Sequence, residues 1–490
     1  MWRWTLGLLV VLGVWALNTQ NHQFHWGYHN DESSKVRQIQ SGERNLRHPP
    51  LMLEVVDLGM MVKGGRENPQ RVVEMGRILS ALYMALALAL LVDWAWVRVH
   101  PLAALGLAMV LPFHAGLFEV GHYFKEDALF LLGIAAALRA LDFWLSAPGV
   151  WSAVLLGLSL ALLGGGKYIG WIMVGCVAVE IGRQAAQSKR SLRWVGLSFL
   201  LATLAIYLPV LVHLERWGVF FKEEVTFLLG GDYGAGLATP HGVYWKLLCD
   251  DFSLIMLVIG LGTFALGAWS RRLPGAWLMP LVCILSLSAL AFTSKYSERY
   301  LLPVQMLAMV IMVSGPVLLC HEGLRRVGLR SVISQVLLLG ATCFFSAILM
   351  KDNLGDFRER WQGFQTDSRL KLFTFIRQHL TPGEVQLAQD TMVQFEDPAY
   401  LDGMKHSYFV ADLGSLEELK AQGFTHLLLS YDVYHRYVDQ SQLLLGQAEE
   451  GYWKRSEFYR EALARGRVLW SAWARNPKAL HPGLSLVELP

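Results

Sequence analysis

Apolar residues in this chain gather into long runs, and short polar stretches separate the runs. A helix needs about twenty apolar residues to cross the hydrocarbon core of a bilayer. The pattern therefore predicts a polytopic membrane protein with about eleven transmembrane helices. The expected spans are Trp4 to Leu17, Ile78 to Val97, Leu102 to Phe118, Ala128 to Leu145, Trp151 to Leu163, Ile169 to Ile181, Trp194 to Val212, Phe252 to Trp269, Ala276 to Phe292, Leu301 to Cys320 and Val332 to Met350.

The first of these runs has two interpretations. Arg3 precedes a short apolar core, and Val14, Trp15 and Ala16 form a weak cleavage site of the kind that ends a signal peptide. Nothing else favours cleavage, so we expect the run to be retained as a helix.

Composition agrees with a membrane protein. Hydrophobic residues make up 54% of the chain and charged residues 17%, which a soluble domain of this length rarely shows. A net charge of +3 gives no indication of nucleic-acid binding. The five cysteines lie singly, without CxxC or metal-ligand spacing, and predict neither a disulfide framework nor a metal site. They are Cys176, Cys249, Cys283, Cys320 and Cys343.

Lys and Arg in the short loops predict the orientation, because they concentrate on the cytoplasmic side. A cytoplasmic amino terminus places every basic short loop inside. We therefore expect a multi-pass protein of the inner (plasma) membrane, with the amino terminus cytoplasmic and everything after Met350 extracytoplasmic. The residues placed inside are Arg98, Arg139, Arg183, Lys189, Arg190, Arg193, Arg271, Arg272, Arg325, Arg326 and Arg330.

Two domains are expected, a transmembrane domain over residues 1–350 and a small α/β domain over residues 351–490. In the second, SRLKLFTFIRQHL has helical periodicity, TPG ends it, and VQLAQ can form a strand. SLEELKAQGFTHLLLSYD predicts a helix, a glycine cap and a buried strand. The domain has no phosphate loop and no nucleophile elbow, which favours a lid or acceptor-docking module over a second catalytic site.

Acids and cations recur in the loops that this orientation places outside. Two acidic pairs, Asp31 with Glu32 and Glu126 with Asp127, face the same compartment as Lys167 and Arg299. A charge at membrane depth costs about 2.5 to 3.5 kcal/mol unless it is paired or solvated. Each acid could simply pair with a cation and hold helix ends. The presence of both acidic and basic residues on the outward side nevertheless favours a catalytic site there.

Such an array suits one class of reaction. A carboxylate can take the proton of an acceptor hydroxyl, and Lys and Arg can stabilise the growing charge of a phosphate leaving group. This chemistry is transfer of a group from a phosphate-linked donor. A donor held by a lipid tail requires a multi-span enzyme with its site at the membrane surface.

Four short motifs resemble those of GT-C glycosyltransferases, in the same order. HNDESSKVRQIQSGERNLRHPP resembles their first outward loop, HYFKEDALFLLGIAAAL their second acidic motif, GGGKYIGW their lysine-tyrosine turn, and ERYLLP the start of a late span. The likeness is strongest to the family 39 type, which includes protein mannosyltransferases and a lipid A aminoarabinose transferase. It covers the membrane part, and LEELKAQGFTHLLLS resembles the outward domain of bacterial members.

The resemblance implies an all-α polytopic GT-C fold with a small C-terminal α/β domain. It also implies a glycosyltransferase that moves a sugar from a polyprenyl-phosphate-linked donor to an acceptor hydroxyl or phosphate, by a metal-independent inverting mechanism. The acceptor could be a glycan, a lipid or a protein. Asp31, Glu32 and Asp127 could hold a divalent cation, but the family likeness favours a site without one.

Residue roles follow from the same resemblance. Asp31 is implied as the base, Asp127 as a second acid, and Lys167 and Arg299 as contacts of the donor phosphate. Glu32 is a further catalytic candidate, and the candidates for substrate binding are Lys125, Glu126, Tyr168 and His241. Lys295 is a further candidate for the site.

Some of these residues have alternative interpretations. His241 resembles a histidine-tyrosine patch of bacterial relatives, but it could equally be a hydrogen-bonded surface residue. His48 and Pro49 are expected to shape the loop. The three glycines before Lys167 predict a loose helix end, which leaves the direction of the lysine open.

We expect residues Gly27 to Leu51 to lie along the outer membrane surface as one or two interfacial helices. Asp31 would then sit under the outward domain, while Val36 and Ile39 would face lipid.

Two other function classes fit less well. A transporter or lipid-linked sugar flippase also places charges at membrane depth, but it usually shows repeat halves and helices broken at the midplane. A non-catalytic scaffold or receptor gives no reason for acids and cations on separate loops.

Overall fold

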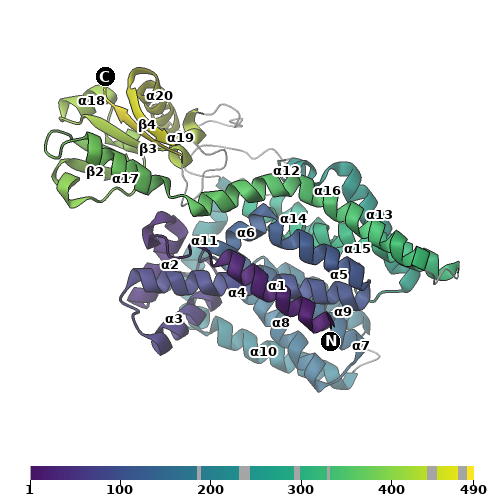
Figure 1. Ribbon diagram of the computed structural model, residues 1–490. Coiled ribbons are helices and arrows are strands. Elements are labelled where there is room, and N and C mark those ends of the chain that lie inside the picture. Colours follow the sequence, from purple (N-terminus) through teal and green to yellow (C-terminus); the bar gives the residue numbers. More distant parts are fainter. Residues whose placement is uncertain are drawn as a thin grey trace.

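The computed structural model describes residues 2–184, 189–230, 243–291, 298–327, 332–438, 450–472 and 483–490. Most of the chain forms a bundle of apolar helices, and a small domain with a β-sheet follows at the C-terminus (Figure 1). This domain lies at one end of the bundle, which we call the domain-side end; the opposite end is the far end.

The first half of the bundle combines the long helices α4 and α7 with several shorter elements. They are α1 (Trp2–Asn18), η1 (Trp26–Tyr28), α2 (Asn30–Ser41), α3 (Leu51–Lys63), α4 (Pro69–Arg98), α5 (Pro101–Val110), η2 (Leu111–Phe113), α6 (Ala115–His122), α7 (Glu126–Ser146), α8 (Val150–Gly166) and α9 (Gly170–Gln184). The second half comprises α10 (Lys189–Val212), α11 (Leu214–Gly230), α12 (Val243–Phe252), α13 (Leu254–Arg271), α14 (Leu278–Ala291), η4 (Glu298–Leu301), α15 (Leu302–Arg326) and α16 (Val332–Gln365).

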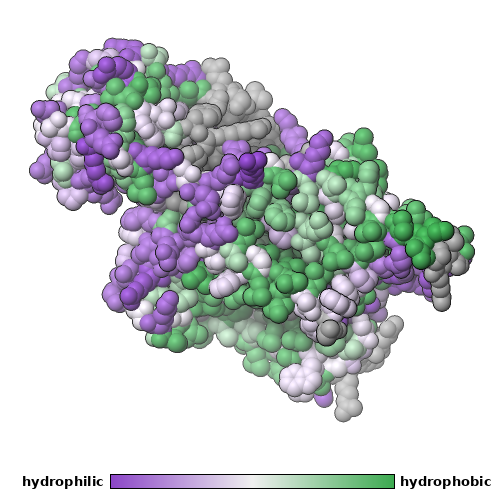
Figure 2. All heavy atoms as spheres, in the orientation of Figure 1, coloured by the Kyte–Doolittle hydropathy of each residue, from purple (hydrophilic) through white to green (hydrophobic). Residues whose placement is uncertain are grey.

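Within the described ranges, six helices are long and apolar enough to cross a membrane, and a bent pair makes up to seven. Three shorter apolar helices, α1, α8 and α14, have 10 to 17 residues. Figure 2 shows a surface that is mostly hydrophobic over the bundle and more hydrophilic over the C-terminal domain. The chain is therefore a multi-pass membrane protein, while the count of eleven spans stays a prediction.

Two stretches of the bundle have features that the apolar runs do not indicate. The span expected over Leu102 to Phe118 is broken by a bend of 61°, because Pro112 lacks a backbone donor and His114 caps a new helix by accepting from the Leu117 N–H. Between the spans expected to end at Val212 and to begin at Phe252, α11 and α12 form two further helices.

Close packing fixes α15 at the centre of the bundle. The most apolar window of this helix is buried along its whole length, whereas only 11% of the α10 window is buried. A Cβ atom on Gly315 would lie 2.7 Å from the backbone nitrogen of Phe264 in α13. Small residues of this kind let membrane helices approach closely.

The segment that contains α2 differs from the expected interfacial helix. Val36 and Ile39 are fully buried in one cluster with Val56 and Val72 of the neighbouring helices, so the prediction that they face lipid is wrong. Their positions on α2 are those of an amphipathic helix, but α3 and α4 cover its apolar face. The surface that sequence alone assigns to lipid is here a protein interface.

The C-terminal domain confirms the expected helices and strands. α17 (Ser368–His379) precedes β1 (Leu387–Asp390), and α18 (Leu416–Ala421) with a Ser415/Glu418 capping box precedes β3 (His426–Ser430). Gly423, at φ +92°, makes the turn between them. The remaining elements are η5 (Pro398–Gly403), β2 (Met404–Ser407), η6 (Val410–Leu413), α19 (Tyr431–Val438), α20 (Glu450–Arg465), β4 (Arg467–Ala472) and β5 (Leu484–Glu488).

The sheet has the strand order β2-β1-β3-β5-β4. β1 pairs in parallel with β2 and β3, and β5 pairs antiparallel with β3 and β4. The boundary expected at residue 350 lies inside α16, which continues to Gln365. One unbroken helix therefore leads from the bundle to the domain.

Candidate functional site

The start of α2 holds Asp31 at the domain-side end. His29 caps the helix and accepts from the Asp31 N–H at 3.2 Å. The Asp31 carboxylate binds two cations through Oδ2, with Arg299 Nη1 at 2.8 Å and Lys125 Nζ at 3.2 Å. Its side chain is 42% exposed. A carboxylate in the first turn is also favoured by the helix dipole.

The second acidic pair lies in the first turn of α7. Asp127 forms an ion pair with Lys167, the residue that follows the last residue of α8. The three glycines before Lys167 are packed tightly, since a Cβ atom on Gly166 would lie 2.7 Å from Phe130 Cα. The expectation of a loose helix end is therefore wrong: close contact with α7 fixes it and directs the lysine toward Asp127.

Tyr300 and Lys35 join these groups. Lys167 Nζ lies 5.3 Å from the centre of the Tyr300 ring, and Arg299 lies 5.6 Å from it. Lys35 Nζ contacts Glu126 Oε1 at 3.2 Å, and both side chains are buried. Sequence reasoning missed Lys35, although it lies four residues after Asp31 and hence on the same face of α2.

We call this set the site cluster. The tertiary structure brings together residues from four separate segments that the sequence keeps far apart. The members are Asp31, Lys35, Lys125, Glu126, Asp127, Lys167 and Arg299.

Glu32 lies outside the exposed part of this cluster. Its side chain is completely buried and both of its oxygens bind Arg77 of α4, at 2.9 and 2.5 Å. It also accepts from the Phe124 N–H at 2.7 Å. These bonds tie α2 to α4 and to the turn before Lys125, and they leave Glu32 no route to contact a substrate in this conformation.

Tyr168 supports the loop after α2. Its hydroxyl donates to the Leu46 carbonyl at 2.9 Å and accepts from Trp217 Nε1 at 3.0 Å. This ring therefore connects the lysine turn, the first loop and α11. His241 and Lys295 lie outside the described residues.

The charges of the cluster shift one another's titration. Partial burial alone would raise the pKa of the Asp31 carboxyl, but Lys125 and Arg299 together hold it well below its usual range. Burial and the neighbouring Arg299 lower the pKa of Lys125 to about 8. At neutral pH, Asp31 is ionised and Lys125 is mostly protonated.

No group of three or more His, Cys, Asp or Glu residues in the described ranges is arranged to hold a metal ion. Asp31 and Asp127 each contact a cationic side chain instead. A mechanism without a metal stays a prediction.

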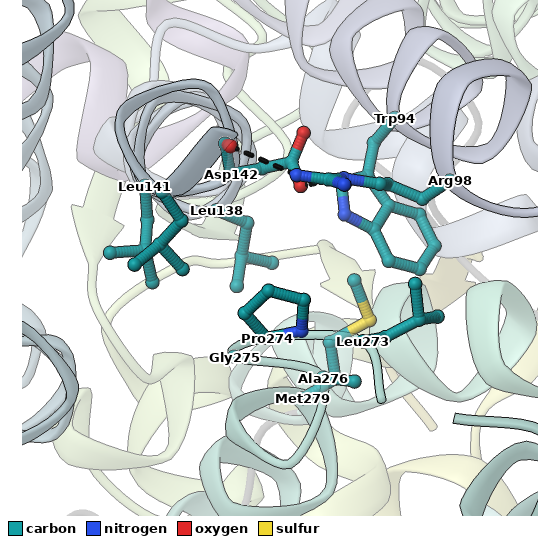
Figure 3. A pocket seen from close by; sticks show the side chains of 11 residues that line it. Trp94, Arg98, Leu138, Leu141, Asp142, Leu273, Pro274, Gly275, Ala276 and Met279 are labelled. Atoms are coloured by element: carbon teal, nitrogen blue, oxygen red, sulfur yellow. Dashed lines mark hydrogen bonds and ion pairs between the residues drawn. The ribbon is translucent and has the colours of Figure 1, made fainter. Parts of the chain in front are cut away.

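A small cavity lies at the far end of the bundle and is separate from the site cluster. The ion pair of Arg98 with Asp142 forms part of its wall, and apolar side chains such as Leu138 and Met279 line the rest (Figure 3). It offers about 20 Å³ to water-sized molecules, which is room for one water. It is too small for a sugar or a lipid.

Comparison with known proteins finds likeness in structure alone. No family model matches the chain, and no curated protein matches it by sequence. Among solved structures, ArnT from Cupriavidus metallidurans bound to undecaprenyl phosphate aligns with a TM-score of 0.54 and 14% identity, over 99% of this chain and 98% of that one. An Archaeoglobus fulgidus oligosaccharyltransferase aligns with a TM-score of 0.50 and 13% identity, over 89% and 70%. The resemblance expected from the motifs is confirmed at the level of the fold: this chain has the fold of GT-C glycosyltransferases.

Proposed function

We propose that this protein is a membrane glycosyltransferase that moves a sugar from a polyprenyl-phosphate-linked donor to an acceptor, by an inverting mechanism without a metal. The observation that carries the proposal is the placement of Asp31. Its half-exposed carboxylate is held between two cations at a helix start, beside the Asp127 and Lys167 pair. The fold shared with ArnT, whose structure holds undecaprenyl phosphate, supports a lipid-linked donor.

Asp31 is the proposed base, and its present contacts suggest how it becomes one. A carboxylate whose pKa is held low by two cations is a weak proton acceptor. Lys125 and Arg299 both contact Oδ2, at 3.2 and 2.8 Å. A donor phosphate would compete for the same two cations. Donor binding would then raise the basicity of Asp31 when the acceptor hydroxyl arrives.

The cations have the complementary task. The site cluster contains three carboxylates and four cations, so one positive charge remains uncompensated. That surplus suits a phosphate whose negative charge grows as the bond to the sugar breaks. Lys167 and Arg299, which both lie near the Tyr300 ring, are the proposed phosphate contacts, and Asp127 orients Lys167.

Glu32 receives a different role from the catalytic one expected. We assign it to positioning, because its bonds to Arg77 and the Phe124 N–H set the distance between Asp31 and Lys125. Tyr168 positions the first loop in the same way, through Leu46.

The proposed location is the outer face of the inner membrane. Arg98, Arg139 and Arg325 lie toward the far end of the bundle, where the positive-inside rule places the cytoplasm. The site cluster and the C-terminal domain would then face outward. The acceptor, which could be a glycan, a lipid or a protein, would approach between them.

The direct test supplies the purified full-length protein in detergent with polyprenyl-phosphate sugars and candidate acceptors. A transferase releases polyprenyl phosphate and forms a glycosylated product. A flippase or transporter moves the donor across a vesicle membrane and leaves it intact. The proposal would be overturned if the donor remained uncleaved in the presence of every acceptor fraction prepared from the cell envelope.

A further inference from the structure

Helix α16 carries an arginine at the junction of several elements of the site. Phe357, Arg360 and Phe364 lie three and four residues apart and therefore share one face of the helix. That face packs on α6, where Phe118 contacts both phenylalanine rings at 4.9 and 5.7 Å between centroids. His122, at the end of α6, lies against Phe364 at 4.1 Å.

Arg360 lies between these two phenylalanines along the helix and binds two acids from different elements. It forms an ion pair with Glu119 of α6, and its Nη2 lies 3.1 Å from Glu298 Oε2 in η4. The Arg360 side chain is only 10% exposed. A planar guanidinium suits this bridging, because its donors point in fixed directions.

Each of the two acids is connected through a short piece of chain to a cation of the site cluster. Glu298 directly precedes Arg299, and α6, which carries Glu119, leads through the turn at Tyr123 and Phe124 to Lys125. Arg299 and Lys125 are the two cations that hold Asp31. The spacing between these cations therefore depends on the spacing between Glu119 and Glu298.

We propose that Arg360 is a positioning residue that sets the separation of Lys125 and Arg299 around Asp31 by bridging Glu119 and Glu298. The role of this site in transfer rests on the proposed function, whereas the bridge itself is a claim about structure. Since α16 continues to Gln365 and α17 starts at Ser368, the bridge also connects the C-terminal domain to the cations of the site.

The test uses the full-length protein with Arg360→Gln, Glu298→Gln and the double variant. Arg377→Gln is the control, because Arg377 pairs with Asp397 in the C-terminal domain, away from the site cluster. The first readout is amide exchange in peptides that cover residues 119–126 and 298–302. The second is KM for the polyprenyl-phosphate sugar beside kcat.

We expect faster exchange in both peptides for Arg360→Gln, and a rise of about tenfold in donor KM for each single variant. The double variant should be no worse than either single one, because residues that act through one contact are not additive. Arg360→Lys, which keeps the charge, should recover part of the loss. A purely structural role would lower the amount of active protein and leave KM unchanged.

The outcomes separate the two claims. If amide exchange and donor KM of Arg360→Gln match those of the Arg377→Gln control, the positioning role is overturned, even though the wild type catalyses transfer. A wild type that releases no polyprenyl phosphate would overturn the proposed function instead, and the exchange data would still decide on the bridge: faster exchange in both peptides supports it, and unchanged exchange overturns it.

Discussion

Helix α7 carries charged residues at both ends, and the two ends are built differently. At the far end, Asp142 and Arg139 join Asp93 and Arg98 of α4 and Arg3 of α1 in what we call the distal cluster. All five residues lie within helices, and every cation is an arginine. At the domain-side end, the site cluster draws on helix starts, a helix end and turns, and three of its four cations are lysines.

The helix dipole explains part of this difference. Glu126 and Asp127 lie in the first turn of α7, where the dipole favours negative charge, whereas Asp142 lies near the carboxyl end, where it favours cations. An acid at the far end therefore depends on its arginines. Arg3 and Arg139 each bind Asp93, at 2.9 and 2.7 Å. The distal cluster therefore holds helices together, whereas the Asp31 carboxylate in the site cluster remains exposed.

The largest effect is expected for Asp31→Asn. The substitution keeps the size of the side chain and removes the proton acceptor, so turnover should fall by about 100-fold to 10,000-fold. Donor affinity should persist, because the cations remain. The measurement is transfer rate beside donor affinity at matched protein levels.

Asp412→Asn is the matched control for this variant. Asp412 has a similarly exposed side chain, at 43%, and pairs with Arg455 within the C-terminal domain. Its loss should leave turnover unchanged. Near-normal turnover in a folded Asp31→Asn protein would exclude Asp31 as the base.

The next largest effect is expected for Lys167→Ala and Arg299→Ala. Removing a charge-assisted contact to phosphate costs about 1.5 to 3 kcal/mol, or roughly 10-fold to 150-fold. Because the contact exists before and during transfer, both donor affinity and rate should fall. Lys405→Ala, at an exposed lysine bound to Gln422, serves as the control. An unchanged donor affinity would remove Lys167 and Arg299 from the phosphate site.

A smaller effect concerns pH. The pKa of Lys125 is lowered to about 8, so this lysine loses its proton as pH rises through that value. The cluster then loses a positive charge for phosphate, and kcat/KM, which reports the free enzyme, should fall on the alkaline side. Lys125→Arg stays protonated and should shift the fall to higher pH. A wild-type profile that stays level up to pH 10 would contradict this assignment.

The smallest effect on catalysis is expected from the distal cluster. Asp93→Asn removes one partner of Arg3 and Arg139 and should lower the free energy of unfolding by about 1 to 3 kcal/mol. Turnover per folded molecule should not change. Thermal unfolding in detergent and transfer by the remaining folded protein measure the two quantities. A large loss of turnover without a loss of stability would contradict a purely structural role for the distal cluster.

The sequence by itself determined the class of protein and the order of its charged motifs. Long apolar runs require a bilayer, and the helix and strand patterns of the C-terminal domain are local in origin, as at α18 and β3. The acids and cations were also recognisable, because Asp31, Asp127, Lys167 and Arg299 each stand at the edge of an apolar run.

Only the tertiary structure decided which of these residues meet. The periodicity of α2 gives Val36 and Ile39 one face, but it cannot tell lipid from α3 and α4 as the partner. Glu32 looks like Asp31 in sequence, yet Arg77, 45 residues further on, buries it. No sequence motif marks Lys35 or Arg360, because the packing of other helices brings their partners near. A charge is a local property of the chain, whereas its partner and its exposure depend on the whole fold.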